Sequence, residues 1–355
     1  MNNSSLHLAA LVVTALGDVS IVGVRETVHE NESFYISAVL DANGRNWYIK
    51  SPRSSDAGLM LEAEAALAPA LIAQLQAGNL PFDVVRPAGF APVKNGRAMV
   101  YSAPFGVAKY FGNLSLNEAH ALGRGLAALH NLSPTVLNNS GMPDYSVTEI
   151  RNRIHSEIIE AIDAAEVPII LRRRWEQVVD DQSLWLFSPT LVHGDFADEN
   201  VLWSEGEISC VLGFGQAHIG DPAADFAQLA TNITPELLSA ALESYTNALD
   251  IESDPNLVTR IVLYSELAIL RWLLHGVRTG DSGIIAEATE MLENLAEEIQ
   301  ADPELAPGPT WEVDLDTAST AKTAVTALTA VTSITSLSAT SSFSADSSDS
   351  AFSAE

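Results

Sequence analysis

Short apolar runs separated by turn residues mark the first hundred residues and predict a small sheet. Five strands are expected, at residues 18–25, 33–41, 45–50, 83–93 and 97–104. The second and third form a hairpin, because Asn43-Gly44 is a strong signal for a tight turn between them. Apolar residues at helical spacing predict a helix over 56–77, which Gly78 ends. These elements define an N-terminal lobe at residues 1–104.

From Ser115 onward the apolar pattern is mostly helical, which predicts a larger C-terminal lobe at residues 105–312. Ser115 with Glu118 three residues later is a capping box at the start of the first of these helices. The final segment, 313–355, is rich in Ser, Thr, Ala and Asp. It has few large apolar residues to bury, so we expect it to be disordered. The whole pattern predicts an α+β fold of two lobes.

Composition and charge narrow the class of protein. The chain has 355 residues with 46 acidic and 18 basic side chains, a net charge of −28. Such a surface suits neither nucleic acid nor an anionic membrane face, so we expect neither as a partner. The charge could steer a cationic small molecule toward the protein, although solubility is the simpler explanation.

No targeting signal is evident near the N-terminus. The apolar segment 6–16 is too short to span a bilayer, and no Lys or Arg precedes Arg25, whereas a secretory signal begins with basic residues. We interpret the segment as an amphipathic helix and expect a cytoplasmic protein that is monomeric or weakly dimeric. Cys210 is the only cysteine, so no intrachain disulfide can form.

The segment with the clearest chemistry begins at His193. His193-Gly194-Asp195, followed by Asn200, has the H-x-D-x-x-x-x-N spacing of the catalytic loop in kinase-like phosphotransferases. In that loop the Asp accepts the proton of the attacking hydroxyl group, and the Asn holds a magnesium ion on the nucleotide phosphates. Asp195 is therefore the expected catalytic base and Asn200 the expected metal ligand, while His193 braces the backbone of the loop.

Seven segments in order along the chain resemble one family. They run from about residue 6 to about residue 300 and read NWYIKSPR, LEAEAALAPAL, LPFDVVRPAGFAP, GRAMVYSAPFG, ALGRGLAALHNLSP, LVHGDFADENVLW and IGDPAADFAQL. Together they resemble the aminoglycoside/macrolide phosphotransferase family, and within it the macrolide-kinase-like branch common in actinobacteria. The resemblance implies a protein-kinase-like two-lobe fold, ATP or GTP together with Mg²⁺, and a small antibiotic-like molecule as hydroxyl acceptor. Helices around 148–178 and 260–298 would line the acceptor pocket.

The resemblance also implies how the N-terminal lobe holds a nucleotide. Lys50 ends the strand WYIK, which resembles the kinase V-A-I-K strand, so Lys50 would contact the α- and β-phosphates and pair with a Glu of the next helix. Glu64 fits best as that partner, and Glu62 is the alternative, because one sequence does not fix helical phase. The segment AMVYSAPFG would be the hinge between the lobes. Its backbone would bind a purine edge at Val100, Tyr101 and Ser102.

One metal ligand is missing from the pattern. VLGFGQAHIGDPAADFAQL matches the family's V-I-D-F-G-x-A-x-x-G-D-P-x-x-D-L-A without a gap, which puts Gly213 where the family has a metal-binding Asp. Asp198, Glu199, Asp221 and Asp225 lie nearby in the sequence. We expect Asp221 to cap a helix and Asp225 to brace the catalytic loop. Two functions remain open: a hydroxyl-directed phosphotransferase with a modified metal site, or a pseudokinase that binds a nucleotide or small molecule without turnover.

Overall fold

The computed structural model describes residues 3–250 and 254–301, so the tail predicted to be disordered, 313–355, lies outside the described residues. A five-stranded antiparallel sheet forms the N-terminal part, in the order β1-β2-β3-β6-β5. Its strands are β1 (Ile21–Glu30), β2 (Phe34–Asp41), β3 (Asn46–Pro52), β5 (Pro87–Val93) and β6 (Gly96–Ser102). The predicted hairpin joins β2 to β3, with Gly44 at a φ of 78°. The sheet is therefore the one that the apolar pattern predicts.

The strand predicted at 83–93 is two strands in the structure. β4 (Asp83–Val84) leaves the sheet and pairs in parallel with β10 (Glu207–Val211) of the helical part. β5 then begins at Pro87 and joins the sheet beside β6. A proline lacks the N–H that a strand interior needs, but it is tolerated as the first residue of a strand. Pro87 therefore marks a break that the prediction missed, and β4 ties the two parts of the molecule together.

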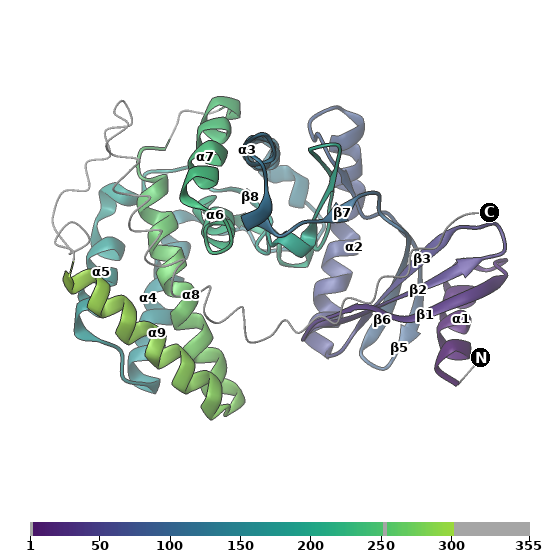
Figure 1. Cartoon of the computed structure of the whole chain (residues 1–355), viewed down its shortest axis with the longest axis horizontal. Coiled ribbons are helices and arrows are strands. Elements are labelled where there is room, and N and C mark those ends of the chain that lie inside the picture. The colour runs from purple at the N-terminus through teal and green to yellow at the C-terminus, as the bar shows by residue number, and fades with distance from the viewer. Residues whose placement is uncertain (1–2, 251–253, 302–355) are drawn as a thin grey trace.

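Two helices cover opposite faces of the sheet. α1 (Asn3–Leu16) confirms the helix expected near the N-terminus and packs Val12 against Val39 and Ile49. α2 (Ser55–Gln76) packs Leu61 against Met99 on the other face, between the sheet and the helical part (Figure 1). By length and composition alone α2 could cross a membrane, but a core helix of this kind passes the same test. We read it as a core helix because it buries residues on the sheet face.

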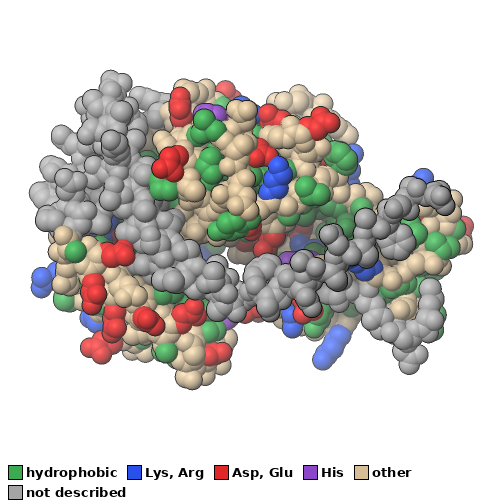
Figure 2. Space-filling model, viewed as in Figure 1, with side chains coloured by type: hydrophobic (Ala, Val, Ile, Leu, Met, Phe, Trp, Pro, Cys, Tyr) green, Lys and Arg blue, Asp and Glu red, His purple; other side chains and the backbone are tan. Residues whose placement is uncertain are grey.

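The C-terminal part is mostly helical, as predicted. Its α-helices are α3 (Leu116–His130), α4 (Val147–Ala164), α5 (Ile169–Asp180), α6 (Ala223–Ala230), α7 (Pro235–Ala248), α8 (Leu257–Thr279) and α9 (Ser282–Ala301). The capping box at α3 is confirmed, because the Ser115 side chain accepts from the Glu118 N–H and the Glu118 carboxylate accepts from the Ser115 N–H. One large apolar core, which includes Trp175 and Trp203, joins these helices. Acidic side chains are scattered over the visible face of this part (Figure 2).

Short strands in the helical part carry the H-x-D loop. β9 (Val201–Ser204) and β10 form a hairpin, and β7 (Val107–Ala108) extends it in the order β4-β10-β9-β7. β8 (Thr190–Val192) pairs with β11 (His218–Gly220). Short turns of 3-10 helix connect these elements. They lie at Phe111–Asn113, Pro134–Leu137, Gln182–Trp185, Asp198–Asn200 and Phe214–Gln216. The loop after β8 therefore leaves a buried strand pair and faces the sheet of the N-terminal part.

Candidate active site

The backbone of the H-x-D loop is fixed by a carboxylate from α6. Asp225 is fully buried and accepts hydrogen bonds from the N–H groups of His193 and Gly194, both at 2.8 Å. Burial acts to raise the pKa of Asp225, but the hydrogen bond with His130 and the loop N–H donors hold that pKa below its usual value. This geometry confirms that Asp225 is a brace for the loop.

His193 braces the same loop from inside. Its Nε2 lies 2.7 Å from the Leu212 carbonyl oxygen and must donate to it, which leaves Nδ1 to accept the Asp195 N–H at 3.1 Å. Gly194 has a φ of 78°, and a Cβ atom there would lie 2.5 Å from the Gln216 carbonyl oxygen. Only glycine fits this turn. The loop therefore presents Asp195 in one orientation, and the bracing role expected of His193 is confirmed.

Both carboxylate oxygens of Asp195 accept hydrogen bonds from side-chain amides. Asn200 Nδ2 donates to Oδ2 at 3.1 Å and to the Asp195 carbonyl oxygen at 2.9 Å. Gln228 Nε2 donates to Oδ1 at 3.0 Å. The H-x-D spacing gives no signal for Gln228, although Gln228 lies three residues after Asp225 and so on the same face of α6. Helix α6 therefore holds the loop backbone through Asp225 and contacts the Asp195 carboxylate through Gln228, one turn later.

Lys50 and Glu64 meet across the N-terminal part. Lys50 Nζ lies 2.8 Å from Glu64 Oε2, and the two side chains are only 10% and 6% exposed. The ammonium also lies 4.3 Å from the centroid of the Phe34 ring. Glu62, the alternative partner, lies one half-turn away on α2 and pairs with Arg97 on the outer surface. The pair that faces inward is therefore Lys50 with Glu64.

A cavity of about 320 Å³ separates the Lys50–Glu64 pair from Asp195. Its walls include Lys50, Glu64 and Tyr101 from the N-terminal part and Asp195, Glu199, Asn200 and Gly213 from the C-terminal part. We call it the interlobe cavity. It brings together most of the residues that the sequence singled out, from positions 50 to 213 in the chain.

The residues expected at the hinge, Val100, Tyr101 and Ser102, do not all face the interlobe cavity. Tyr101 lines the interlobe cavity, but Val100 packs in the opposite face and Ser102 does not line the cavity. The backbones of Val100 and Tyr101 are paired with both β3 and β5, because β6 is a central strand. Pro104 and Gly106, a few residues further on, line the cavity instead. The base contact expected at Val100, Tyr101 and Ser102 stays a prediction, and of these three residues Tyr101 lines the cavity.

A second cavity of about 680 Å³ adjoins the interlobe cavity, and we call it the acceptor cavity. Met60, Gly215 and Gln216 line both cavities, while Gly194 and Gln228, which flank Asp195, line this one. Its remaining wall comes largely from α4 and α8, through Ile150, Arg153, Ile154, Glu157, Tyr264, Ala268 and Arg271. These residues fall within the segments 148–178 and 260–298 expected to line an acceptor pocket, whereas α5 and α9 contribute no residue to the lining.

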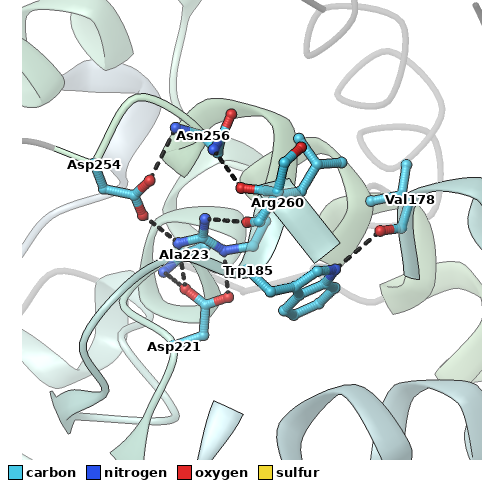
Figure 3. A network of polar contacts seen from close by, with 9 residues as sticks. Val178, Trp185, Asp221, Ala223, Asp254, Asn256 and Arg260 are labelled. Carbon is cyan, nitrogen blue, oxygen red and sulfur yellow. Dashed lines mark hydrogen bonds and ion pairs between the residues drawn. The ribbon is translucent and has the colours of Figure 1, made fainter. Parts of the chain in front are cut away.

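The carboxylates near Gly213 do not make up a magnesium site. Gly213 has a φ of 77°, and a Cβ atom there would lie 2.8 Å from Asn200 Oδ1, an atom that accepts no hydrogen bond from the described residues. Asp221 is engaged elsewhere: it accepts from the Ala223 N–H, as a helix cap would, and binds Arg260 (Figure 3). Within residues 3–250 and 254–301, no three His, Cys, Asp or Glu side chains could hold one metal ion.

Magnesium prefers one or two carboxylates besides phosphate and water. Apart from Asp195 itself, this site offers the Asn200 amide oxygen and, at the rim, Glu199, whose pKa is raised by desolvation. The residues present therefore do not fit the metal site that the family resemblance implies, and we derive no step through a metal.

A sheet with an inward Lys–Glu pair, facing a braced H-x-D loop across a cavity, defines the class of kinase-like phosphotransferases. The chain belongs to the phosphotransferase enzyme family, whose sequence profile matches residues 26–256. The uncharacterized protein YcbJ of Bacillus subtilis (strain 168) is 25% identical over 222 residues, which cover 61% of this chain and 72% of YcbJ.

Solved structures share the fold. The macrolide 2'-phosphotransferase MphH from Brachybacterium faecium, an apoenzyme, is 20% identical with a TM-score of 0.68, over 81% of this chain and 96% of MphH. The GDP and kanamycin complex of APH(2")-IIia is 22% identical with a TM-score of 0.67, over 83% of this chain and 99% of that one. The predicted protein-kinase-like two-lobe fold is confirmed.

Proposed function

We propose that the protein transfers the γ-phosphoryl group of ATP or GTP to a hydroxyl group of a small molecule. The observation that carries this proposal is the position of Asp195. Asp195 lines the interlobe cavity together with the Lys50–Glu64 pair, and its neighbours Gly194 and Gln228 line the second, larger cavity. A solved structure with the same fold holds GDP and kanamycin, which supports a nucleotide and a small acceptor at this kind of cleft.

The nucleotide would occupy the interlobe cavity. Lys50 would contact the phosphates as a charged donor, and Glu64 would keep its ammonium directed into the cavity. The base would lie against Tyr101 and the segment around Pro104 and Gly106. This orientation places the phosphate end of the nucleotide toward Asp195, on the opposite wall.

Asp195 would accept the proton of the acceptor hydroxyl as its oxygen attacks the γ-phosphorus. The new bond joins the hydroxyl oxygen to phosphorus, the bond to the β-phosphate oxygen breaks, and the nucleoside diphosphate leaves. Each carboxylate oxygen has a second lone pair, so the amides of Asn200 and Gln228 do not prevent this role. The two amides fix the orientation of the Asp195 carboxylate, with Oδ1 directed toward Gln228 and the acceptor cavity that Gln228 lines.

A nucleotide-binding protein without turnover is the second candidate, and Gly213 is the observation that favours it. The two candidates differ in one assay. Purified protein is incubated with γ-labelled ATP or GTP and a panel of hydroxyl compounds, and phosphorylated product is detected by mass. A phosphorylated product that forms with the wild-type protein but not with Asp195→Asn supports the transferase function. Nucleotide binding with no product from any compound supports the binding protein.

A further inference from the structure

We infer that the acceptor cavity selects a hydroxyl compound that carries an anionic group, such as a carboxylate, and an apolar body. This inference rests on the proposed function, because it concerns the acceptor of the same site. Three features of the cavity lead to it: its carboxylates are already paired, one arginine at its wall is not, and the rest of its lining is largely apolar and aromatic.

The two acidic side chains that line the cavity are each neutralised by an arginine. Asp221 is 2% exposed and binds Arg260 through both carboxylate oxygens, at 2.7 and 3.1 Å (Figure 3). Glu157, on α4, binds Arg271 of α8 at 2.9 Å. A bidentate or short arginine pair leaves little charge to attract an ammonium group. Among the described residues, Glu157 and Asp221 are the acidic side chains that line this cavity, and Asp195 lines the interlobe cavity instead.

Arg153 carries the positive charge that is left over. Its guanidinium carbon lies 4.5 Å from the centroid of the Tyr145 ring, and among the described residues it has no ion pair or hydrogen bond. Stacking on a tyrosine holds the guanidinium in place without using its N–H donors. Five N–H donors in a planar fork match a carboxylate or phosphate in two-point contact.

The surroundings of Arg153 keep it available to a ligand. Glu149 lies one turn earlier on α4, but its carboxylate accepts from the N–H and hydroxyl of Ser146 at the helix cap. Glu160, one turn before the end of α4, binds Arg278 at 2.8 Å. Among the described residues no carboxylate forms an ion pair with the Arg153 guanidinium, although Glu149 reduces the positive potential at the cavity mouth.

The aromatic wall favours a flat or apolar acceptor body. Tyr145 meets the His218 ring edge-on at 5.5 Å, and His218 Nδ1 lies 2.9 Å from the Gln216 carbonyl oxygen, which fixes the imidazole. Ile150, Ile154 and Ala268 complete the apolar lining. A polycationic amino sugar would need several free carboxylates here, and the lining supplies none, even though the chain as a whole has a net charge of −28.

Three probes that share one primary alcohol and one ring test the inference: 4-(hydroxymethyl)benzoate, benzyl alcohol and 4-(hydroxymethyl)benzylamine. Their dissociation constants are measured by ligand-observed NMR on the full chain with ATP present. We expect the carboxylate to bind at least about tenfold more tightly than the amine. Arg153→Glu should remove or reverse that preference. Arg173→Glu makes the same change in net charge at an exposed arginine of α5 outside the cavity, and it should leave the preference unchanged.

Equal binding of carboxylate and amine, no binding of any probe, or the same loss in both variants would overturn the inference. Phosphoryl transfer from ATP to the three probes is measured separately. Carboxylate binding that depends on Arg153, without transfer, would support the inference and reject the transferase. Transfer to benzyl alcohol, without a preference for the carboxylate, would retain the transferase and reject the inference.

Discussion

Replacing Gly213 with Asp should make nucleotide binding depend on magnesium. The new carboxylate would lie on the wall of the interlobe cavity, beside Asn200 and across from Lys50. It would add the hard, charged oxygen ligand that the site lacks. In the absence of metal it would place a like charge near Asp195 and the phosphates. The two effects have opposite signs, so a magnesium titration separates them.

The structure sets the size of each effect. Gly213 has a φ of 77°, a region in which an Asp costs roughly 1 kcal/mol, and its Cβ atom would lie 2.8 Å from Asn200 Oδ1. Asn200 must therefore shift slightly, and we expect Tm to fall by about 2–4 °C. Like charges about 4–6 Å apart repel by roughly 3–4 kcal/mol at an effective dielectric constant of 20, and solvent in the open cavity reduces this. Nucleotide affinity should therefore fall about tenfold in chelator and rise about tenfold in millimolar magnesium.

The assay is nucleotide binding by calorimetry across a magnesium series, with EDTA at the low end. Gly213→Asn is the first control, because it has the same shape and backbone conformation without the charge. Gly44→Asp is the second: Gly44 has a φ of 78°, a Cβ atom there meets nothing within 4 Å, and it lies in the β2–β3 turn. Strong magnesium dependence in the wild-type protein, with no gain in Gly213→Asp, would show that another group already supplies the metal ligand at this position. Glu199 would then be the carboxylate to replace next.

Three further substitutions test the loop. Asp195→Asn should reduce phosphoryl transfer by about 10²–10⁴-fold while nucleotide affinity by calorimetry stays within about threefold, and equal activity would remove Asp195 from the mechanism. Gln228→Leu should reduce kcat by about tenfold with little change in nucleotide affinity, because the Asp195 carboxylate loses an orienting donor, and an unchanged kcat would show that the 3.0 Å hydrogen bond is only structural. Asp225→Asn should cost about 2–3 kcal/mol of stability in urea denaturation at pH 7, because one of the two loop N–H groups that Asp225 binds loses its acceptor. The folded-state pKa of Asp225 is held below its usual value, so the stability that its carboxylate contributes is complete at neutral pH and is lost as pH falls through the folded-state pKa. The difference in stability between Asp225→Asn and wild type should therefore narrow in acid. A difference that stays constant with pH would contradict this.

Local signals explain why much of the fold could be predicted from the sequence. The Asn43-Gly44 turn, the Ser115 capping box and the helical spacing before Gly78 each depend on neighbours within a few residues, and each is present in the structure. Part of the H-x-D loop is likewise local, because the Asp195 N–H donates to the ring of His193, only two residues earlier.

What could not be predicted depends on contacts distant in sequence. The face of β6 that Val100 occupies is set by α1, some ninety residues earlier, and the break before Pro87 is set by pairing of β4 with β10. Asp221 is not available to bind a metal because its carboxylate pairs with Arg260, 39 residues later in the chain. The contact of Gln228 with Asp195 spans 33 residues, and its only sequence signal is the helical spacing from Asp225.

Calorimetric titration with ATP and GTP tests whether the interlobe cavity binds a nucleoside triphosphate through Lys50. The comparison is wild type against the double variant Lys50→Met/Glu64→Gln, which leaves no buried charge unpaired. Arg97→Gln, which breaks the outer pair with Glu62, is the control. We predict one site per chain, binding weakened about 10- to 100-fold in the double variant, and no change in the control. Absence of binding of either nucleotide to the wild type, or equal affinity in the double variant, would contradict the account.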